Sequence, residues 1–182
     1  RSRGLGDVYK RQIYTSPSMG GATFTAAYRQ APAVAAESMT DFAIAISPEA
    51  VDGLTLGAAM SNNTIATSVD SDESTMYATY ATGGFTFGIQ SSDLDHTTAN
   101  SDQESIAYGI TYAVNDDLSI GYSYHELDFE IASKLDQEST GVSASYTMGG
   151  MTLAGAMNDV DNMGGTDTKD FEGYEFTLSF AF

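Results

Sequence analysis

The sequence predicts an all-β protein, an antiparallel up-and-down transmembrane β-barrel of which about 10–11 strands are present. Three observations support this class. Apolar and polar residues alternate along most of the chain, which is the period of a strand with different surroundings on its two sides. Short turns and longer polar connections follow one another in alternation, and most acidic residues lie in or beside the longer connections.

The first twelve residues are expected to lie outside this fold. They hold four of the seven basic residues and lack the apolar core of a signal peptide. They resemble the leaders translated from foreign DNA at the broken ends of assembled sequences. We therefore expect residues 1–12 to be a foreign leader and residues 13–182 to be a partial barrel domain whose N-terminal part is missing.

Each expected strand carries apolar residues at every second position. The strands are expected at 13–16 (a short segment), 22–30, 41–48, 54–62, 73–82, 85–95, 103–114, 118–129, 137–148, 151–161 and 171–182. The apolar sides are, in chain order, Phe24 and Tyr28; Phe42, Ile44 and Ile46; Leu54, Leu56 and Met60; Phe85, Phe87 and Ile89; Ile106, Tyr108, Ile110 and Tyr112; Leu118, Ile120, Tyr122 and Tyr124; Val142, Tyr146 and Met148; Met151, Leu153 and Met157; and Tyr174, Phe176, Leu178 and Phe180. The pattern is weakest at 73–82, where Tyr77 and Tyr80 compete for the same face.

The connections predict the two ends of the barrel. Tight turns are expected at 19–21, 49–53, 83–84, 115–117 and 149–150, because glycine and asparagine adopt the positive φ of hairpin turns. Longer loops are expected at 31–39, 64–72, 96–102, 130–136 and 162–170. With the C-terminus on the periplasmic side, 19 of the 24 acidic residues beyond the leader lie in or beside these longer loops. Short turns are thus predicted to face the periplasm and long acidic loops the exterior.

Composition excludes several classes of protein. The chain has no cysteine, so disulfides and cysteine-based metal sites are absent. Its apolar runs are far shorter than the roughly 20 residues of a transmembrane helix. The net charge of −18 disfavours binding to nucleic acid, whose phosphates require basic surfaces. Lipid of the outer membrane is the expected surrounding of the apolar faces.

The last nine residues, 174–182, form a strand with one wholly apolar, half-aromatic side. This segment resembles the closing strand of Gram-negative outer-membrane barrels, in which the terminal aromatic residue is read by the barrel-assembly machinery. The resemblance implies that Tyr174, Phe180 and Phe182 form the assembly signal.

From residue 13 to residue 182 the chain resembles the C-terminal two thirds of a Gram-negative general porin, a family of trimeric diffusion pores with barrels of about 16 strands. Strand rhythm, Gly-Gly turns, acidic loops and the terminal strand carry the resemblance. It implies location in the cell outer membrane and a homotrimer at full length. It also places residues 13–16 at the end of the sixth strand, and the pore-constricting loop in the missing region.

The polar side of the strands predicts the function. Its residues are small and hydrophilic, as in a barrel that is open to water; they include Arg29, Gln90, Asn158, Glu175, Thr111 and Ser143. We expect passive diffusion of small hydrophilic solutes and ions, a preference for cations at the acidic mouth, and no enzymatic activity. Arg29 either faces a carboxylate across the lumen or is an ordinary wall residue.

Two further sites and two further protein classes stay open. Asp159, Asp161, Asp167 and Asp170 offer hard oxygen ligands for Ca²⁺, as do Asp70, Asp72 and Glu73, although a solvated acidic loop is the favoured explanation for them; no other cofactor is expected. His125 beside Glu126 and Asp128 could serve catalysis or be an ordinary histidine at a loop edge. The alternatives to a porin are a smaller complete outer-membrane barrel, acting as an enzyme or adhesin, and a soluble β-sandwich.

Overall fold

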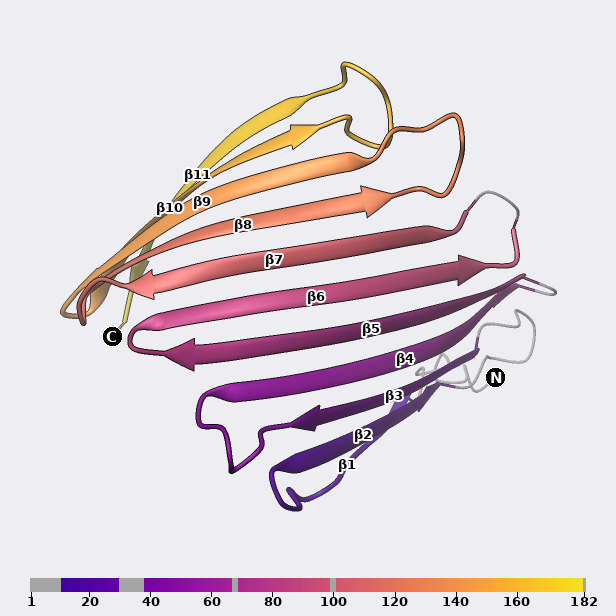
Figure 1. Cartoon of the computed structure of the whole chain (residues 1–182), viewed down its shortest axis with the longest axis horizontal. Helices are drawn as coiled ribbons and strands as arrows, with labels where there is room; N and C mark the ends of the chain where they lie inside the picture. Colours follow the sequence, from indigo (N-terminus) through magenta and orange to yellow (C-terminus); the bar gives the residue numbers. More distant parts are fainter. Residues whose placement is uncertain (1–10, 30–37, 67–68, 99–100, 182) are drawn as a thin grey trace, which may run out of the picture.

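The computed structural model describes residues 11–29, 38–66, 69–98 and 101–181. These residues form one antiparallel sheet of 11 strands, in which each strand pairs with its neighbours along the chain (Figure 1). The strands are β1 (Arg11–Thr15), β2 (Ala22–Arg29), β3 (Ser38–Ile46), β4 (Leu54–Ala66), β5 (Val69–Thr82), β6 (Phe85–His96), β7 (Gln103–Ala113), β8 (Leu118–Asp128), β9 (Gln137–Met148), β10 (Met151–Asp161) and β11 (Phe171–Phe180). In the part of the chain that the structure describes, no helix is long and apolar enough to cross a membrane.

Tight turns produce the up-and-down order. Gly83 and Gly84 join β5 to β6 with φ angles of 55° and 84°, values that residues with a Cβ adopt only with strain. Between β7 and β8 the side chain of Asn115 accepts hydrogen bonds from the backbone N–H groups of Asp117 and Leu118, at 2.9 and 2.8 Å. These side-chain bonds add to the backbone bonds of the turn, in which the N–H of Val114 donates to the carbonyl of Leu118 at 2.8 Å. Local residues therefore determine which strands become neighbours.

The expected order of strands is confirmed, with one correction. The loop predicted at 64–72 is wrong, because β4 continues to Ala66 and β5 begins at Val69. Asn62 donates a side-chain hydrogen bond to Asp72 across the two strands, and Asn63 donates one to Glu73 at 3.4 Å. Polar residues thus continue the ladder of β4 and β5 beyond the apolar part of the sheet, where alternation of hydrophobicity no longer marks a strand.

Two predictions fall partly on residues outside the described ranges. Residues 30–37, which hold most of the loop predicted at 31–39, are among these, and β3 begins at Ser38. Residues 1–10 of the predicted leader also lie outside them, whereas Arg11 and Gln12 pair with Arg29 and Tyr28 in the ladder of β1 and β2. The foreign origin of residues 1–12 stays a prediction.

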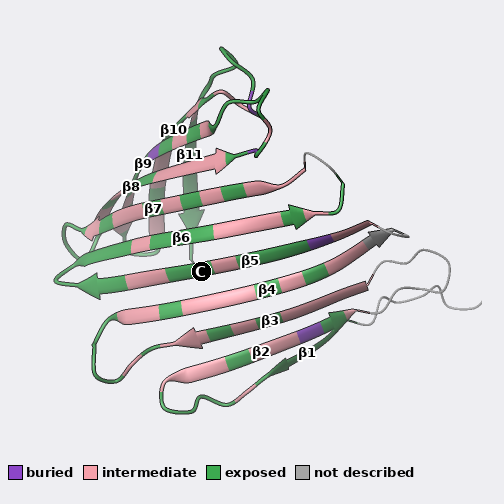
Figure 2. Ribbon diagram, turned by 45° about the vertical axis from the view of Figure 1, so that its right-hand side comes forward, coloured by how far each residue is buried: buried purple, intermediate pink, exposed green. Residues whose placement is uncertain are grey.

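The sheet is a single curved layer without a hydrophobic core (Figure 2). Among the described residues only Ala27, Phe129, Ser71 and two glycines, Gly141 and Gly165, are buried, whereas Tyr174 and Phe176 are 79% and 75% exposed. A soluble β-sandwich would cover such side chains with a second sheet. Their exposure along the whole sheet instead requires a nonaqueous surrounding. β1 and β11 form the two edges and do not pair with each other.

Candidate functional site

The register divides the side chains of the sheet into two faces, because directly paired residues point to the same side. We name them the polar face, which carries Thr111 and Ser143, and the apolar face, which carries Ile110 and Tyr122. One row of paired residues on the polar face crosses six strands; its members are Thr86, Thr111, Gly121, Ser143, Ala156 and Glu175. Thr111, Ser143 and Glu175, which are predicted to line the pore, thus lie in one row on alternate strands.

The other residues predicted to line the pore lie on the same face. Gln90 belongs to a row with Tyr77, Ala107 and His125. Asn158 pairs with Gly141 and Gly173, in a row that also contains Thr79, Gly88, Gly109 and Ser123. Arg29 pairs with Arg11 and Met39 near the edge of the sheet.

Short hydrogen bonds hold the polar face together. Gln90 donates from Nε2 to Ser92 Oγ at 3.1 Å, and the hydroxyls of Ser92 and Thr75 lie 2.9 Å apart. Thr177 donates to Glu175 at 3.1 Å. These bonds fix small polar groups at defined positions on the wall and leave the remaining groups free to contact water.

Charge on the polar face is concentrated near β1 to β4. Arg11 forms an ion pair of 3.0 Å with Asp41, which also accepts a hydrogen bond of 2.7 Å from Ser61. Arg29 has no ion pair among the residues that the structure describes, and its Nε is buried without a hydrogen bond. Sequence reasoning missed Arg11, because it lies in the range assigned to the leader.

Several hollows lie against the polar face, among them two that share Gln90. One of about 500 Å³ is lined by Gln90, Thr111, Ser143 and other residues of β5 to β9. A second, of about 470 Å³, adjoins Asp41, Ser61 and Glu73, and Gln90 lines both. Small or absent side chains form their floor, so the wall offers hydroxyl and amide groups to hydrophilic molecules without filling the space.

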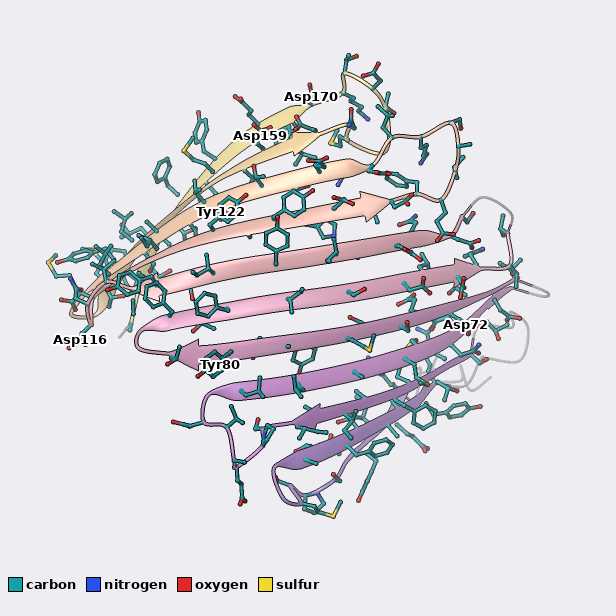
Figure 3. The ribbon with its side chains drawn as sticks, in the orientation of Figure 1. Asp72, Tyr80, Asp116, Tyr122, Asp159 and Asp170 are labelled. Atoms are coloured by element: carbon teal, nitrogen blue, oxygen red, sulfur yellow. The ribbon has the colours of Figure 1, made fainter. Side chains whose placement is uncertain are left out.

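Tyr77 is a residue of the polar face that the sequence left ambiguous. The register pairs Tyr77 with Gly57 and Tyr80 with Leu54, so Tyr80 belongs to the apolar face (Figure 3). A Cβ at Gly57 would lie 2.1 Å from Cε1 of Tyr77, which means that the ring covers this glycine. The glycine at position 57 was the one sign in the sequence that could have indicated the face of Tyr77, because its missing side chain leaves room for the ring.

The apolar face has the features of a surface in lipid. Ring centroids of Phe85 and Tyr112 lie 4.3 Å apart, and those of Tyr108 and Tyr124 lie 4.9 Å apart, in cross-strand stacks. Near the long connections, the last apolar residue of this face is followed two positions further along the strand by an acidic one. The pairs, each with the apolar residue first, are Ile106 and Glu104, Tyr124 and Glu126, Met157 and Asp159, and Tyr174 and Glu172. The change marks the level at which the lipid-facing band ends.

Acidic residues gather at the end of the sheet with the long connections. Figure 3 places Asp72 and Asp170 at this end and Asp116 at the opposite one. Carboxylate oxygens of Asp93, Glu104 and Glu130 lie within 4.8 Å of one another, in an arrangement that could hold a metal ion.

The carboxylates that the sequence suggested for Ca²⁺ do not form such a group in the described part of the chain; they are Asp159, Asp161, Asp167 and Asp170, with Asp70, Asp72 and Glu73 as the second set. Asp170 instead accepts a hydrogen bond from the backbone N–H of Asn162 at 3.1 Å, and Asp72 accepts one from Asn62. Calcium binding by these residues stays a prediction.

The pKa of Glu130, in the connection from β8 to β9, is raised above its usual range. Loss of hydration contributes most, followed by repulsion from the carboxylates of Glu104, Asp102, Asp128 and Asp93. Folding therefore disfavours the ionised form of Glu130. The penalty is fully present above the raised pKa and disappears as the pH falls through it toward the ordinary value.

We expect Glu130→Gln to raise the thermal unfolding midpoint at neutral pH, because the substitution removes the repelled charge. As the pH falls from neutral toward the ordinary glutamate pKa, the wild-type chain should gain stability from this loop that the variant does not gain. Thermal unfolding followed by circular dichroism over this range measures the difference. Glu49→Gln, which removes the same charge at the opposite end of the sheet, should keep the wild-type pH dependence. An unchanged pH dependence in Glu130→Gln would contradict the expectation.

His125 is separated from the carboxylates that flank it in the sequence. It lies on the polar face and pairs with Ala107 and Ser139, whereas Glu126 and Asp128 lie on the other face. His125 has no hydrogen-bond or ion-pair partner within the described ranges, although it borders the hollow of about 500 Å³. The geometry of an acid that orients a catalytic base is therefore not formed by these three residues.

The residues predicted as an assembly signal lie on the last strand. Tyr174 and Phe180 belong to the apolar face of β11, where Tyr174 pairs with Met157 and Phe180 with Met151. Phe182 lies outside the described residues.

Comparison with known proteins places this sheet among outer-membrane channels. A family model described as Gram-negative porin matches residues 5–135. The anion-selective porin from Comamonas acidovorans aligns with a TM-score of 0.77 at 15% identity, over 93% of this chain and 58% of that one. The outer-membrane expressed OmpT of Vibrio cholerae aligns with a TM-score of 0.68 at 14% identity, over 93% and 64% of the two chains. This chain therefore spans less than two thirds of either structure.

A shorter protein covers a similar part of this chain. The KdgM porin, solved in complex with disordered oligogalacturonate, aligns with a TM-score of 0.52 at 11% identity, over 94% of this chain and 91% of that one. At nearly equal coverage of this chain, the higher score of the longer Comamonas porin indicates that the curvature of the sheet is closer to that protein. A search of curated protein sequences finds no match.

Proposed function

The chain belongs to the Gram-negative porin family and is located in the cell outer membrane, and we propose that it forms the wall of a pore for passive diffusion of small hydrophilic solutes and ions. One observation carries the proposal: a continuous polar face, with hollows of about 500 and 470 Å³, lies behind a face of exposed aromatic and aliphatic side chains. A barrel built from such a sheet separates lipid from water and encloses a wet lumen.

The lumen-facing side chains are small, so they leave space for a solute to pass and interact with it only weakly. Hydroxyl and amide groups such as Thr111, Ser143 and Asn158 replace part of the hydration of a passing solute without binding it tightly. Passage needs interactions that are weak enough for the solute to leave. Size then limits which molecules enter, and fixed charge biases their sign.

Reconstitution in liposomes tests the proposal. Vesicles that contain the folded chain should swell in iso-osmotic solutions of small neutral solutes, faster for smaller molecules, and planar bilayers should show ohmic conductance. Vesicles that stay sealed although the protein is folded and inserted would contradict it.

A smaller barrel, similar in size to the KdgM porin, is the second candidate, because the chain covers 91% of that porin. It would also conduct, but through a narrower lumen. The closer match of curvature to the longer porin favours the wider barrel. Single-channel conductance and the size cut-off for neutral polymers separate the two widths.

We expect a preference for cations, because the net charge is −18 and the long connections are acidic. In a gradient of potassium chloride, the reversal potential should have the sign of potassium selectivity, and it should decrease at high salt as the charges are screened. Glu73→Gln and Glu175→Gln on the polar face should lower the ratio of cation to anion permeability, whereas Asp116→Asn at a short turn should lower it less. Selectivity for chloride in the wild-type chain would refute this expectation; the selectivity named for the Comamonas porin belongs to that protein.

The partners follow from the same proposal. Outer-membrane lipid covers the apolar face, the barrel-assembly machinery recognises Tyr174, Phe180 and Phe182, and the full-length protein forms a homotrimer. Assembly assays with the last strand altered at Tyr174 and Phe180 test the recognition step.

A further inference from the structure

We propose that Tyr77 and the residues around it form a weak binding subsite for an uncharged sugar ring on the lumen wall. The inference rests on the proposed diffusion function and names a class of solute for it. It begins from the position of an aromatic ring on the polar face, where the neighbouring residues are small.

The Tyr77 ring lies against the wall. A Cβ built at Gly57 would come within 2.1, 2.3 and 2.7 Å of its Cε1, Cζ and hydroxyl oxygen. Gly57 has no positive φ, so the backbone does not demand a glycine at this position. The missing side chain instead makes room for the ring, which is 36% exposed and turned toward the lumen side of the sheet.

The surroundings of the ring are hydroxylated and uncharged. Tyr77 lies between Thr75 and Thr79 on its own face of β5 and pairs across the strands with Gln90. The hydroxyl of Tyr77 has no hydrogen-bond partner among the described residues, and of the Gln90 amide only Nε2 is engaged, with Ser92. The Thr75 hydroxyl is engaged with Ser91 and Ser92, so the free groups around the ring, within the described part of the chain, are the hydroxyls of Tyr77 and Thr79 and the amide oxygen of Gln90.

This chemistry selects among possible ligands. The charged residue next along the polar face of β5 is Glu73, four residues from Tyr77, or about 13 Å at the rise of an extended strand. An organic cation or anion would find no opposite charge at the ring. A pyranose has C–H groups on one side, which pack on the negative face of an aromatic ring, and hydroxyls around its edge, which suit Thr79 and Gln90.

The position also suits a solute in transit. Gln90 borders the hollows on both sides, and Tyr77 lines the one of about 500 Å³. A sugar held at Tyr77 would therefore stand in one hollow of the wall, next to Gln90, which also borders the other. One stacked ring supplies only weak binding, which allows the solute to leave again.

Maltotriose serves as the probe, and saturation-transfer NMR of the folded chain in detergent micelles measures its binding without requiring conductance. We expect Tyr77→Leu, which keeps apolar bulk over Gly57 but removes the ring, to weaken binding by about two- to tenfold, the loss of one stacked contact. Tyr77→Phe should retain most of the binding. Tyr80→Ala removes a tyrosine of the same strand from the apolar face and should leave binding unchanged.

A second variant tests the proposal in case Tyr77→Leu does not fold. Gly57→Ala keeps Tyr77 but forces its ring from the wall, and it should also weaken binding. Absence of maltotriose binding in the wild-type chain, equal binding by Tyr77→Leu, or preference for trigalacturonate over maltotriose would each overturn the proposal. Conductance without maltotriose binding would refute the subsite alone, whereas Tyr77-dependent binding without conductance would refute the diffusion function alone.

Discussion

Replacing Ile110 with arginine should lower the free energy of unfolding of the lipid-embedded chain by about 2–4 kcal/mol, the cost of a basic side chain on the lipid face near the bilayer midplane. Ile110 pairs with Phe87 and Tyr122 in the middle of the apolar face, so no charged side chain pairs with it. The guanidinium would have to reach the interface or draw water into the hydrocarbon region. Denaturant titration of the chain in lipid vesicles measures the loss.

The neighbouring residue provides the control. Thr111 lies on the polar face between Thr86 and Gly121 and borders the hollow of about 500 Å³. Thr111→Arg introduces the same charge one position further along β7, where water and space are available, and should change stability little. Equal losses for Ile110→Arg and Thr111→Arg would mean that the two faces are not exposed to different solvents.

Much of this architecture could be predicted from the sequence, because a period of two is a local property. β9 and β10 have the same bounds as the expected segments 137–148 and 151–161. The polar residues expected to share a face, such as Gln90 and Thr111, do share it for the same reason. The two sides of an alternating strand cannot exchange without a shift of register.

Features that depend on pairing with another strand could not be predicted in this way. Tyr77 and Tyr80 lie on opposite faces of β5, although both are tyrosines and the sequence does not distinguish them. Only the register with β4 assigns Tyr77 to the polar face. The carboxylates of Asp93, Glu104 and Glu130 are far apart in sequence and follow no motif. Their proximity arises because Asp93 and Glu104 pair across β6 and β7 and because the connection from β8 to β9 brings Glu130 to them.

The extension of β4 and β5 through the loop predicted at 64–72 could not be predicted for a different physical reason. Above the lipid-facing band both faces of a strand meet water, so nothing in the sequence has to alternate there. Asn62 and Asp72 continue the strands through hydrogen bonds between polar side chains. Hydrophobic periodicity therefore reports the part of a strand that crosses lipid and not its full length.

We expect Gly21→Ala to destabilise the chain by about 2–4 kcal/mol, because two costs combine at this turn. Gly21 has a φ of 81°, which strains any residue with a Cβ. A Cβ there would also lie 2.1 Å from the backbone oxygen of Ser47, which cannot move without disturbing the pairing of β2 with β3. The bond of 2.9 Å from Ser47 N–H to the Gly21 carbonyl would be lost with it.

Gly20 separates the two costs, since it has a φ of 59° but no atom within 4 Å of the position that a Cβ would occupy. Gly20→Ala should therefore cost only the strain of the left-handed conformation, about 1–2 kcal/mol. Gly20→Asn should cost less, because asparagine tolerates that conformation. Denaturant titration of the three variants in vesicles measures these differences. If Gly20→Ala were as harmful as Gly21→Ala, backbone strain alone would explain both positions, and close contact between neighbouring hairpins would not be what requires Gly21.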